Sequence, residues 1–360
     1  FTVSHLEDFS SDINLLSTLQ FNLSMSKFPG VSYLKELLFG SQLKYSLTST
    51  SVIKLKMLLQ KYTFDTVFCF RWQAGWVAKK YCNNIQRCAK TLVDLDDIDS
   101  KAMERHLALE HKLLGKEMCL INQLRINRQR DIEQKLALFS ETLIVCSDSD
   151  KVELSNRLKG CSIKAIPNCI SIPEEKHTPK QRNNDQLIIL FVGTMSYPPN
   201  EDAILYFCND IYPELQNQLY PIKPKLNIVG FAPSERVKSL DDGSSVLVTG
   251  GVDSVTPYYL EADLVICPVR HGGGTRIKIL EAMSFGLATV STVIGAEGID
   301  VKHDLNILLS ADTFQFQDNC FQLLCDEKRR KDIGVAGKDL VVQKYSIEVI
   351  ISQLQQLLNE

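Results

Sequence analysis

The sequence lacks the features that would mark several protein classes. No apolar run approaches the roughly 18 residues that a membrane-spanning helix needs, and the best run, residues 187–192, has the length of a strand. No CxxC pair occurs, and the eleven cysteines are an odd number that lies mostly in apolar contexts. They fit small buried side chains in a reducing compartment better than a disulfide framework or a zinc site. We therefore expect a cytoplasmic protein whose membrane contact is at most peripheral.

The chain also has little net charge. Its 40 Lys and Arg residues against 43 Asp and Glu residues leave a formal net charge of −3, so we expect no nucleic-acid partner. No GxGxxG motif follows an expected strand, which disfavours a Rossmann oxidoreductase. With 44% hydrophobic and 23% charged residues, the 360-residue chain is typical of a globular protein large enough for two domains.

Strand-length apolar runs alternate with helical patterns along the chain. In the first half the expected strands are residues 2–6, 66–70, 90–95, 142–147 and 162–166. In the second half they are residues 187–193, 225–230, 245–250, 263–268, 288–292 and 306–310. Helical patterns in the first half cover residues 51–62, 74–82, 100–140 and 149–158. This alternation predicts an α/β protein with parallel sheets covered on both faces.

Three prolines and a dense polar stretch interrupt the pattern over residues 167–186. We expect a Rossmann-like domain over residues 1–170, a linker over 171–186 and a second Rossmann-like domain over 187–345. Residues 346–360 are expected to form a helix that packs back on the N-terminal domain. Because ligands of doubly wound sheets bind beyond the carboxyl ends of the strands, the active site would be the cleft between the domains.

The run HGGGTRIKILEAMSFG, which begins at His271, follows a short apolar strand and opens a helix. Its three consecutive glycines let the backbone approach a ligand, and the helix presents unpaired N–H groups and a positive dipole end. Arg276 lies in the first turn, where the dipole favours Asp or Glu, so its position indicates a nearby anion. The loop therefore predicts an anion site, and a diphosphate fits it best.

Charged residues of this helix extend the predicted site. Arg276 and Lys278 supply positive charge for phosphate oxygens, and each charge-assisted hydrogen bond contributes about 1.5–3 kcal/mol. Glu281 lies a turn and a half into the helix, where its carboxylate could accept hydrogen bonds from ribose hydroxyls. The alternative is that Lys278 and Glu281 form an ordinary i,i+3 surface pair and that the glycines only make a tight turn.

Five segments together resemble the retaining, nucleotide-sugar-dependent glycosyltransferases of group 1, or family 4-like, that build bacterial surface polysaccharides. They are residues 93–100, 166–173, 191–207, 257–299 and 344–350. The resemblance runs from about residue 2 to residue 350, and the block from GGGTRIKILEA to GAEG is its most diagnostic part. It implies the GT-B architecture, in which two Rossmann-like domains face each other across a cleft, with the acceptor on the N-terminal side.

The resemblance also implies the donor-binding residues. Gly193 would open the donor side of the cleft, and Glu281 matches the second glutamate of the family's Glu-x7-Glu motif, which binds the ribose. Apart from the resemblance, the position of His271 near a strand end predicts that it faces the leaving group. The residues expected to approach the diphosphate are Gly272, Gly273, Gly274, Thr275 and Arg276. The residues of the loop expected to pass the nucleobase include Gly250, Val252 and Asp253.

Three departures from the family pattern accompany this resemblance. The first glutamate of the motif falls on Gly273, so its usual contact with the sugar is missing or provided elsewhere. No Arg or Lys follows the first strand of the second domain, which places the phosphate-neutralising role on Arg276 and Lys278. Residues 2–6 are similar to the family's second strand, so we expect the first strand and its Gly-rich loop to be absent from this sequence.

An acidic run, residues 94–99, follows a strand of the first domain. The resemblance places Asp96 near the family's active-site histidine, with Asp97 beside it, and either could orient the acceptor hydroxyl or the donor sugar. Crowding of carboxylates is expected to raise some of their pKa values. One alternative is a solvated loop with helix capping by Asp99 or Ser100. Another is metal binding, because Asp94-x-Asp96 also matches the DxD of the other glycosyltransferase architecture.

Arg71 and Trp72 follow another strand of the first domain. On the acceptor side, Arg71 could contact an anionic acceptor or sugar and Trp72 could stack on a pyranose ring; a surface arginine and a core tryptophan are the alternatives. Arginines between residues 101 and 135 have apolar neighbours, as in a membrane-surface helix, but balancing acids favour an ordinary solvated face.

These features predict a retaining glycosyltransferase of the hexosyltransferase type. A nucleoside-diphosphate sugar would be the donor and a glycan or lipid-linked molecule the acceptor. The expected catalytic residues are Asp96, Asp97, Arg276 and Lys278, with no cofactor and no metal ion. The alternative is a non-catalytic, glycosyltransferase-like subunit that binds a sugar nucleotide or a partner. The oligomeric state is left open.

Overall fold

The computed structural model describes residues 53, 55–57, 60, 64–81, 90–115, 120–174 and 187–360. The expected strand at residues 2–6 lies outside the described residues. So do most of the helical pattern at residues 51–62 and residues 175–186 of the expected linker.

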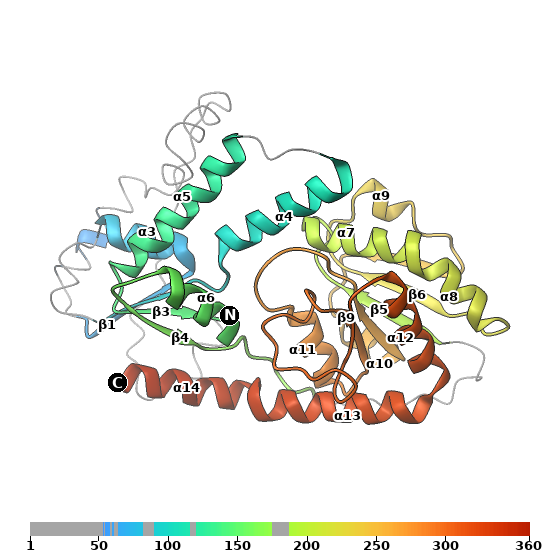
Figure 1. Cartoon of the computed structure of the whole chain (residues 1–360). Helices are drawn as coiled ribbons and strands as arrows, with labels where there is room; N and C mark the ends of the chain where they lie inside the picture. The colour runs from blue at the N-terminus through green and yellow to red at the C-terminus, as the bar shows by residue number, and fades with distance from the viewer. Residues whose placement is uncertain are drawn as a thin grey trace.

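Two parallel sheets form the centres of two lobes (Figure 1). In the described part of the chain, the first sheet has the order β1 (Thr66–Phe70), β2 (Lys90–Asp94), β3 (Thr142–Val145), β4 (Ser162–Ala165). The second sheet consists of β5 (Ile188–Val192), β6 (Lys225–Val229), β7 (Val246–Gly250), β8 (Leu264–Cys267), β9 (Thr289–Thr292) and β10 (Leu308–Ser310). The predicted pair of Rossmann-like α/β domains is confirmed, and each described strand begins and ends within two residues of its expected bounds.

Helices cover both sheets (Figure 1). Those of the first domain are α3 (Arg71–Tyr81), α4 (Asp99–Leu114), α5 (Leu120–Ala137) and α6 (Asp148–Arg157). Those of the second are α7 (Pro198–Tyr206), the π-helix η5 (Phe207–Ile211), α8 (Tyr212–Leu219), α9 (Glu235–Lys238), α10 (Thr256–Glu261), α11 (Ile277–Ser284) and α12 (Thr313–Cys325). The helical pattern expected over residues 100–140 forms two helices, α4 and α5, and not one. Gly115 ends α4 in a left-handed conformation with φ 63°, which a glycine adopts without strain.

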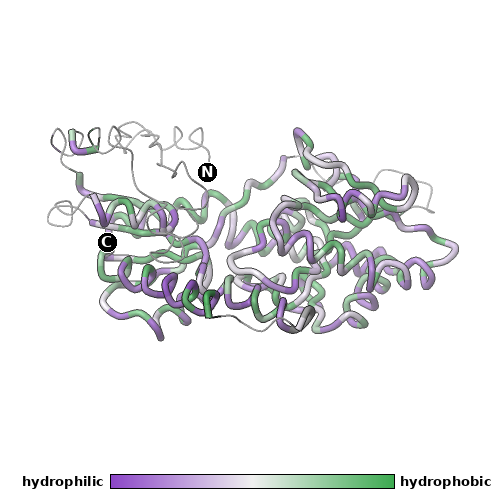
Figure 2. Tube along the Cα trace, turned by 90° about the horizontal axis from the view of Figure 1, so that it is seen from above, coloured by the Kyte–Doolittle hydropathy of each residue, from purple (hydrophilic) through white to green (hydrophobic). Residues whose placement is uncertain are grey.

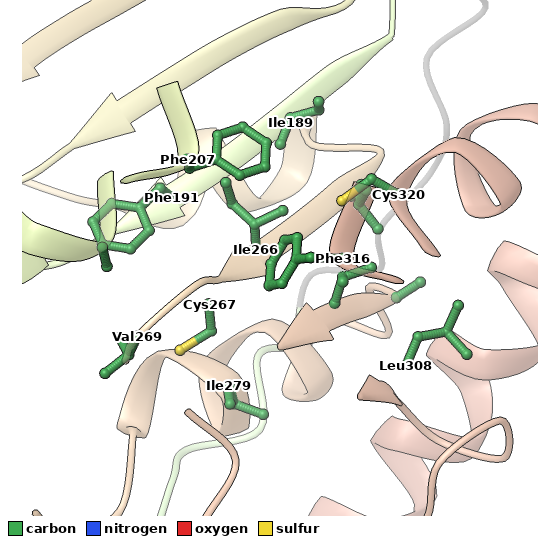
Figure 3. Close-up of a cluster of buried hydrophobic side chains, with 14 of the residues drawn as sticks. Ile189, Phe191, Phe207, Ile266, Cys267, Val269, Ile279, Leu308, Phe316 and Cys320 are labelled. Carbon is green, nitrogen blue, oxygen red and sulfur yellow. The ribbon is translucent and has the colours of Figure 1, made fainter. Parts of the chain in front are cut away.

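The core of the second domain lies between its sheet and helices α7 to α12. Phe191 and Ile266 from neighbouring strands meet Phe207 and Phe316 from the covering helices, and all four are fully buried (Figure 3). The rings of Phe207 and Phe316 pack edge to face with centroids 6.0 Å apart. Burial of each such side chain contributes roughly 1.5–3 kcal/mol, so this core holds the strand ends, and the loops that follow them, in fixed positions.

The order of the second sheet determines where a ligand can bind. Its strands run β10-β9-β8-β5-β6-β7, so the chain leaves β5 toward one edge and later returns to pair β8 on the other side of β5. In doubly wound sheets, ligands bind at the carboxyl ends of the two strands that flank this reversal. Here these ends lead into Gly193 after β5 and the loop at residues 268–276 after β8.

Two C-terminal helices run along one side of both lobes (Figure 1). Helix α13 (Glu327–Lys344) packs against α11 of the second domain, and α14 (Ile347–Asn359) reaches the first sheet. There Leu357 is buried against Leu92 and Ile144, and Lys90 Nζ donates a hydrogen bond to the Leu357 carbonyl at 2.7 Å. The last helix therefore ties the two domains together.

Seen from above, hydrophilic and hydrophobic residues alternate along the helices (Figure 2). Such alternation is typical of helices with one buried and one solvated face. Among the described helices, none is both long enough and apolar enough to cross a lipid bilayer.

We predict that Leu357→Ala weakens the attachment of α14 to the first domain. Loss of this buried side chain should lower the free energy of unfolding by about 2–5 kcal/mol, because the site cannot fully close around the cavity. Urea unfolding measures the change. Leu358→Ala is the matched control, because the neighbouring side chain is exposed. Equal effects of the two substitutions would contradict the role given to Leu357.

Candidate functional site

The loop between β8 and α11 has a backbone that only glycine adopts readily. Gly272 and Gly274 have φ angles of 111° and 67°, in the left-handed region. Space is also limited, because a methyl group on Gly272 would lie 3.1 Å from Arg276 Nη2 and 3.2 Å from Pro199 Cγ. The glycines therefore bring the loop backbone close to the side chain of Arg276.

Arg276 immediately precedes α11 and is only 7% exposed. Its Nη1 donates hydrogen bonds to the carbonyls of Gly273 and Gly274. Its Nε and Nη2 are buried and have no hydrogen-bond partner among the described residues. A buried, permanently charged group with unpaired donors is unfavourable by itself, so this geometry favours an anionic ligand beside the loop.

Lys278 lies beneath the carboxyl end of β5 and is 8% exposed. Its Nζ donates a 2.7 Å hydrogen bond to Asn200 Oδ1 and lies 4.0 Å from the centre of the Phe191 ring. A methyl group on Gly193 would approach Nζ to 2.8 Å, so the ammonium lies directly under that backbone. Burial lowers the pKa of Lys278 to about 8. The alternative of a surface pair between Lys278 and Glu281 is wrong.

Glu281 instead accepts a 2.8 Å hydrogen bond at Oε2 from the hydroxyl of Tyr259. The Tyr259 ring stacks on Phe285 at 5.0 Å and belongs to α10. Helix α10 follows the residues of the expected nucleobase loop, in which Gly250 has a left-handed φ of 69° and Val252 and Asp253 come next. The tyrosine thus fixes that loop relative to the Glu281 carboxylate.

His271 and Thr275 face the N-terminal domain. His271 is 3% exposed, its Nδ1 has no partner in the described part of the chain, and its ring centre lies 5.0 Å from that of His106 on α4. Burial lowers the pKa of His271, so its imidazole is neutral at neutral pH. Thr275 lies against Cys146, whose thiol pKa is raised by burial to about 12.

Arg71 and Asp96 meet at the carboxyl ends of β1 and β2. Arg71 Nη2 lies 2.8 Å from Asp96 Oδ2, and both residues have left-handed backbones, with φ angles of 66° and 61°. Such strain in non-glycine residues costs about 1–3 kcal/mol each and is typical of functional sites. The Asp94 carboxylate accepts a hydrogen bond from the Asp96 N–H at 2.9 Å. In the described residues, no cluster of three or more His, Cys, Asp or Glu side chains could hold a metal ion.

Asp97 projects across the cleft to the glycine loop. A methyl group on Gly273 would lie 2.2 Å from Asp97 Oδ1, so the carboxylate occupies the space next to this glycine. Burial, with a smaller contribution from Asp99, raises the pKa of Asp97 to about 6. Burial likewise raises that of Asp94 to about 6. The expected direction is therefore confirmed, although burial contributes more than crowding.

The interpretation of Trp72 as a sugar-stacking residue is wrong. Its side chain is 6% exposed and packs in the core of the first domain. Burial of the apolar ring between α3 and the sheet stabilises the fold more than exposure would, so the ring offers no face to a pyranose. Helix α3 begins at Arg71, three residues earlier than expected, and this turns Trp72 inward.

Sequence reasoning missed a network of ion pairs that joins the domains. Lys101 on α4 contacts Asp150 at 2.9 Å within its own domain and Glu297 of the second domain at 3.2 Å. Arg105, one turn further along α4, binds both carboxylate oxygens of Glu297 and donates to the Gly272 carbonyl at 3.4 Å. Burial alone would raise the pKa of Glu297, but the two cations hold it below its usual value. The only sequence feature that pointed to this network was the GAEG segment, which contains Glu297.

The family comparison matches the part of the chain that contains the glycine loop and α11. Residues 186–326 match the family described as "Glycosyl transferases group 1". This segment is therefore similar to the group 1 glycosyl transferases. The chain is also 26% identical, over 174 residues, to an uncharacterized 44.6 kDa protein in the cps region of Klebsiella pneumoniae; the match covers 46% of this chain and 44% of that protein. The chain thus matches less than half the length of its curated relatives.

Solved structures show that the structural similarity extends beyond residues 186–326. Sucrose-phosphate synthase from Thermosynechococcus elongatus has a TM-score of 0.70 at 19% identity, covering 94% of this chain and 82% of that chain. HepE from Anabaena, solved with UDP and glucose, has a TM-score of 0.63 at 16% identity, covering 89% and 82%. The predicted GT-B architecture is therefore confirmed.

We predict that Asp97→Asn stabilises the protein in a pH-dependent way. Because the pKa is about 6 in the folded chain and 3.8 is the ordinary value, ionised Asp97 opposes folding above pH 6. The two-unit difference corresponds to at most about 3 kcal/mol at neutral pH, and the gain should shrink steadily between pH 6 and pH 4. Thermal unfolding across this range measures it, with the exposed Asp131→Asn as control. A pH-independent change would contradict the prediction.

Proposed function

We propose that the protein transfers a sugar from a nucleoside-diphosphate sugar to a glycan or lipid-linked acceptor, with retention of configuration, in the synthesis of cell-surface polysaccharide. The observation that carries the proposal is the buried Arg276 guanidinium, whose two unpaired donors lie at the point where the second sheet reverses its strand order. The structural similarity to HepE, solved with UDP and glucose, supports this class of donor. The relative from a cps region is in keeping with the polysaccharide context.

The donor would lie along the carboxyl ends of the second sheet. Its nucleobase would pass residues 250–253, its ribose hydroxyls would donate to Glu281, and its diphosphate would lie against the glycine loop. Glu281 uses Oε2 for Tyr259, and Oε1 makes no hydrogen bond with the described residues. One carboxylate oxygen therefore positions the residue, and the other is available to the ribose.

Charge stabilisation would drive the bond cleavage. As the glycosidic bond breaks, negative charge grows on the outer phosphate, and Arg276, Lys278 and the N-terminus of α11 supply positive charge beside it. Carbonyl groups hold Arg276, and Asn200 holds Lys278, so little reorganisation is needed during the reaction. A bound diphosphate would also favour the charged form of Lys278, whose pKa of about 8 lies close to neutrality.

The acceptor would enter from the N-terminal domain. Arg71 is 59% exposed in its side chain and lies beside Asp96, so this pair can contact an anionic or hydroxyl-bearing acceptor. The cross-domain contacts of α4 close the cleft around both substrates, which limits the access of water to the reacting bond. The family resemblance implies attack from the same face as the leaving group, without a protein nucleophile.

We predict that Arg276→Ala lowers kcat/KM at least ~100-fold, which corresponds to about 2.7 kcal/mol of lost transition-state stabilisation. The donor is first selected by thermal shift among UDP-, GDP-, dTDP- and ADP-sugars, and its hydrolysis or transfer is then measured. Arg329→Ala, which removes a surface pair with Asp304, is the control. A mutant within about threefold of wild type would remove Arg276 from this role. Tight donor binding without turnover on any acceptor would instead favour a non-catalytic binding subunit.

We further predict that turnover needs no metal ion. The Asp96 carboxylate is paired with Arg71, and the Asp94 carboxylate bonds the Asp96 backbone, so the DxD residues are already engaged within the protein. Activity measured after dialysis against EDTA should equal that of untreated enzyme. Loss of activity that Mn²⁺ restores would show that a metal takes part.

A further inference from the structure

The space beside Gly273 contains a carboxylate from the opposite domain. A methyl group on Gly273 would lie 2.2 Å from Asp97 Oδ1, 2.6 Å from Oδ2 and 2.7 Å from Cγ. Gly273 itself has an ordinary backbone conformation, unlike Gly272 and Gly274 on either side of it. A side chain at position 273 is therefore excluded by Asp97 and not by the local backbone.

Asp97 has the surroundings of a ligand-binding group. No described residue donates a hydrogen bond to its carboxylate, although the group is partly buried and faces Arg276 electrostatically. A carboxylate removed from water in this way needs hydrogen-bond donors. The unpaired guanidinium donors of Arg276 belong to the same loop, so a molecule whose phosphates reach Arg276 would present its next group to Asp97.

We propose that Asp97 accepts a hydrogen bond from a hydroxyl group of the donor's sugar. The N-terminal domain would thus supply the carboxylate that recognises the sugar, and this carboxylate lies where a side chain at position 273 would otherwise be. The inference rests on the function proposed above. It makes Asp97 a specificity-determining residue for the sugar. The nucleotide would bind to the second domain alone, whereas the sugar is recognised by both domains together.

The position of Asp97 depends on the ion pairs of α4. This helix begins at Asp99, two residues after Asp97, and its Arg105 and Lys101 bind Glu297 of the second domain. The same Arg105 donates to the carbonyl of Gly272, next to Gly273. Asp97 can therefore reach the glycine loop only while α4 is held against the second domain. Recognition of the sugar is thus coupled to closure of the cleft.

The first test compares two affinities by calorimetry at pH 7.5. The probes are UDP and UDP-glucose, with GDP and GDP-mannose as a second pair. For each pair we compare the affinity for the nucleotide sugar with the affinity for the nucleotide, as a ratio. Asp97→Asn should leave the affinity for the nucleotide within about threefold of the wild-type value. It should lower the ratio of nucleotide-sugar affinity to nucleotide affinity about 10-fold or more, which is the expected effect of losing a hydrogen bond to a charged group. Asp131→Asn removes an exposed carboxylate of the same domain and should change neither value.

The second test moves the carboxylate to the other domain. Gly273→Ala should lower the ratio, because its methyl group displaces Asp97. The double variant Asp97→Ala/Gly273→Asp places a carboxylate in the same space and should restore the ratio to within about threefold of wild type. Glu297→Gln should lower the ratio in the wild-type background but not in the double variant. Glu153→Gln, which removes the partner of Lys101 at 3.0 Å within its own domain, is the matched control.

The outcomes separate this inference from the function on which it rests. If the wild-type chain binds neither these four probes nor any dTDP- or ADP-sugar of the thermal-shift screen, both the proposed function and the inference fall. If it binds them, and Asp97→Asn changes the affinity for nucleotide and for nucleotide sugar by the same factor, the function stands and the inference is overturned, because Asp97 then acts only through its charge beside Arg276. Melting temperatures no more than a few degrees below that of wild type show that each variant is folded. A failure of the double variant to restore the ratio would overturn the inference.

Discussion

The site depends on the buried guanidinium of Arg276, because the protein supplies hydrogen-bond acceptors for only some of its donors. Two loop carbonyls hold Arg276 in place, and its remaining donors, Nε and Nη2, are buried without a hydrogen-bond partner among the described residues. A guanidinium stays charged at all relevant pH values, so these donors favour an anion. The left-handed glycines on either side of Gly273 bring the carbonyls within reach, which makes the loop backbone part of the binding chemistry.

Burial disfavours the charged forms of several side chains at this site. Burial lowers the pKa of Lys278 and raises those of Asp94 and Asp97, so in each case the protein disfavours the charged form. Groups perturbed in this way cluster where a ligand of opposite charge or suitable hydrogen-bonding capacity is handled. Of these three groups, the cation Lys278 belongs to the second domain, whereas the carboxylates Asp94 and Asp97 belong to the first. Closure of the cleft brings these charges together.

Much of the fold could be predicted from the sequence because parallel strands are buried on both faces and therefore form continuous apolar runs. This explains why the described strands lie within two residues of expectation. The helices were harder, since periodicity shows neither the break at Gly115 nor the early start of α3 at Arg71. The second of these errors led to the wrong placement of Trp72, whose burial depends on which way the first turn of α3 faces.

The sequence by itself determined the glycine loop, its arginine and the helix that follows, because these features are local and each follows from backbone freedom or helix electrostatics. Only the tertiary structure decided which groups complete the site. Lys278 finds Asn200 at a separation of 78 residues, and Arg105 finds Glu297 at 192. Apolar periodicity shows which side of an element is buried but not which element covers it. The meeting of Asp97 with Gly273 therefore depends on how the two domains pack.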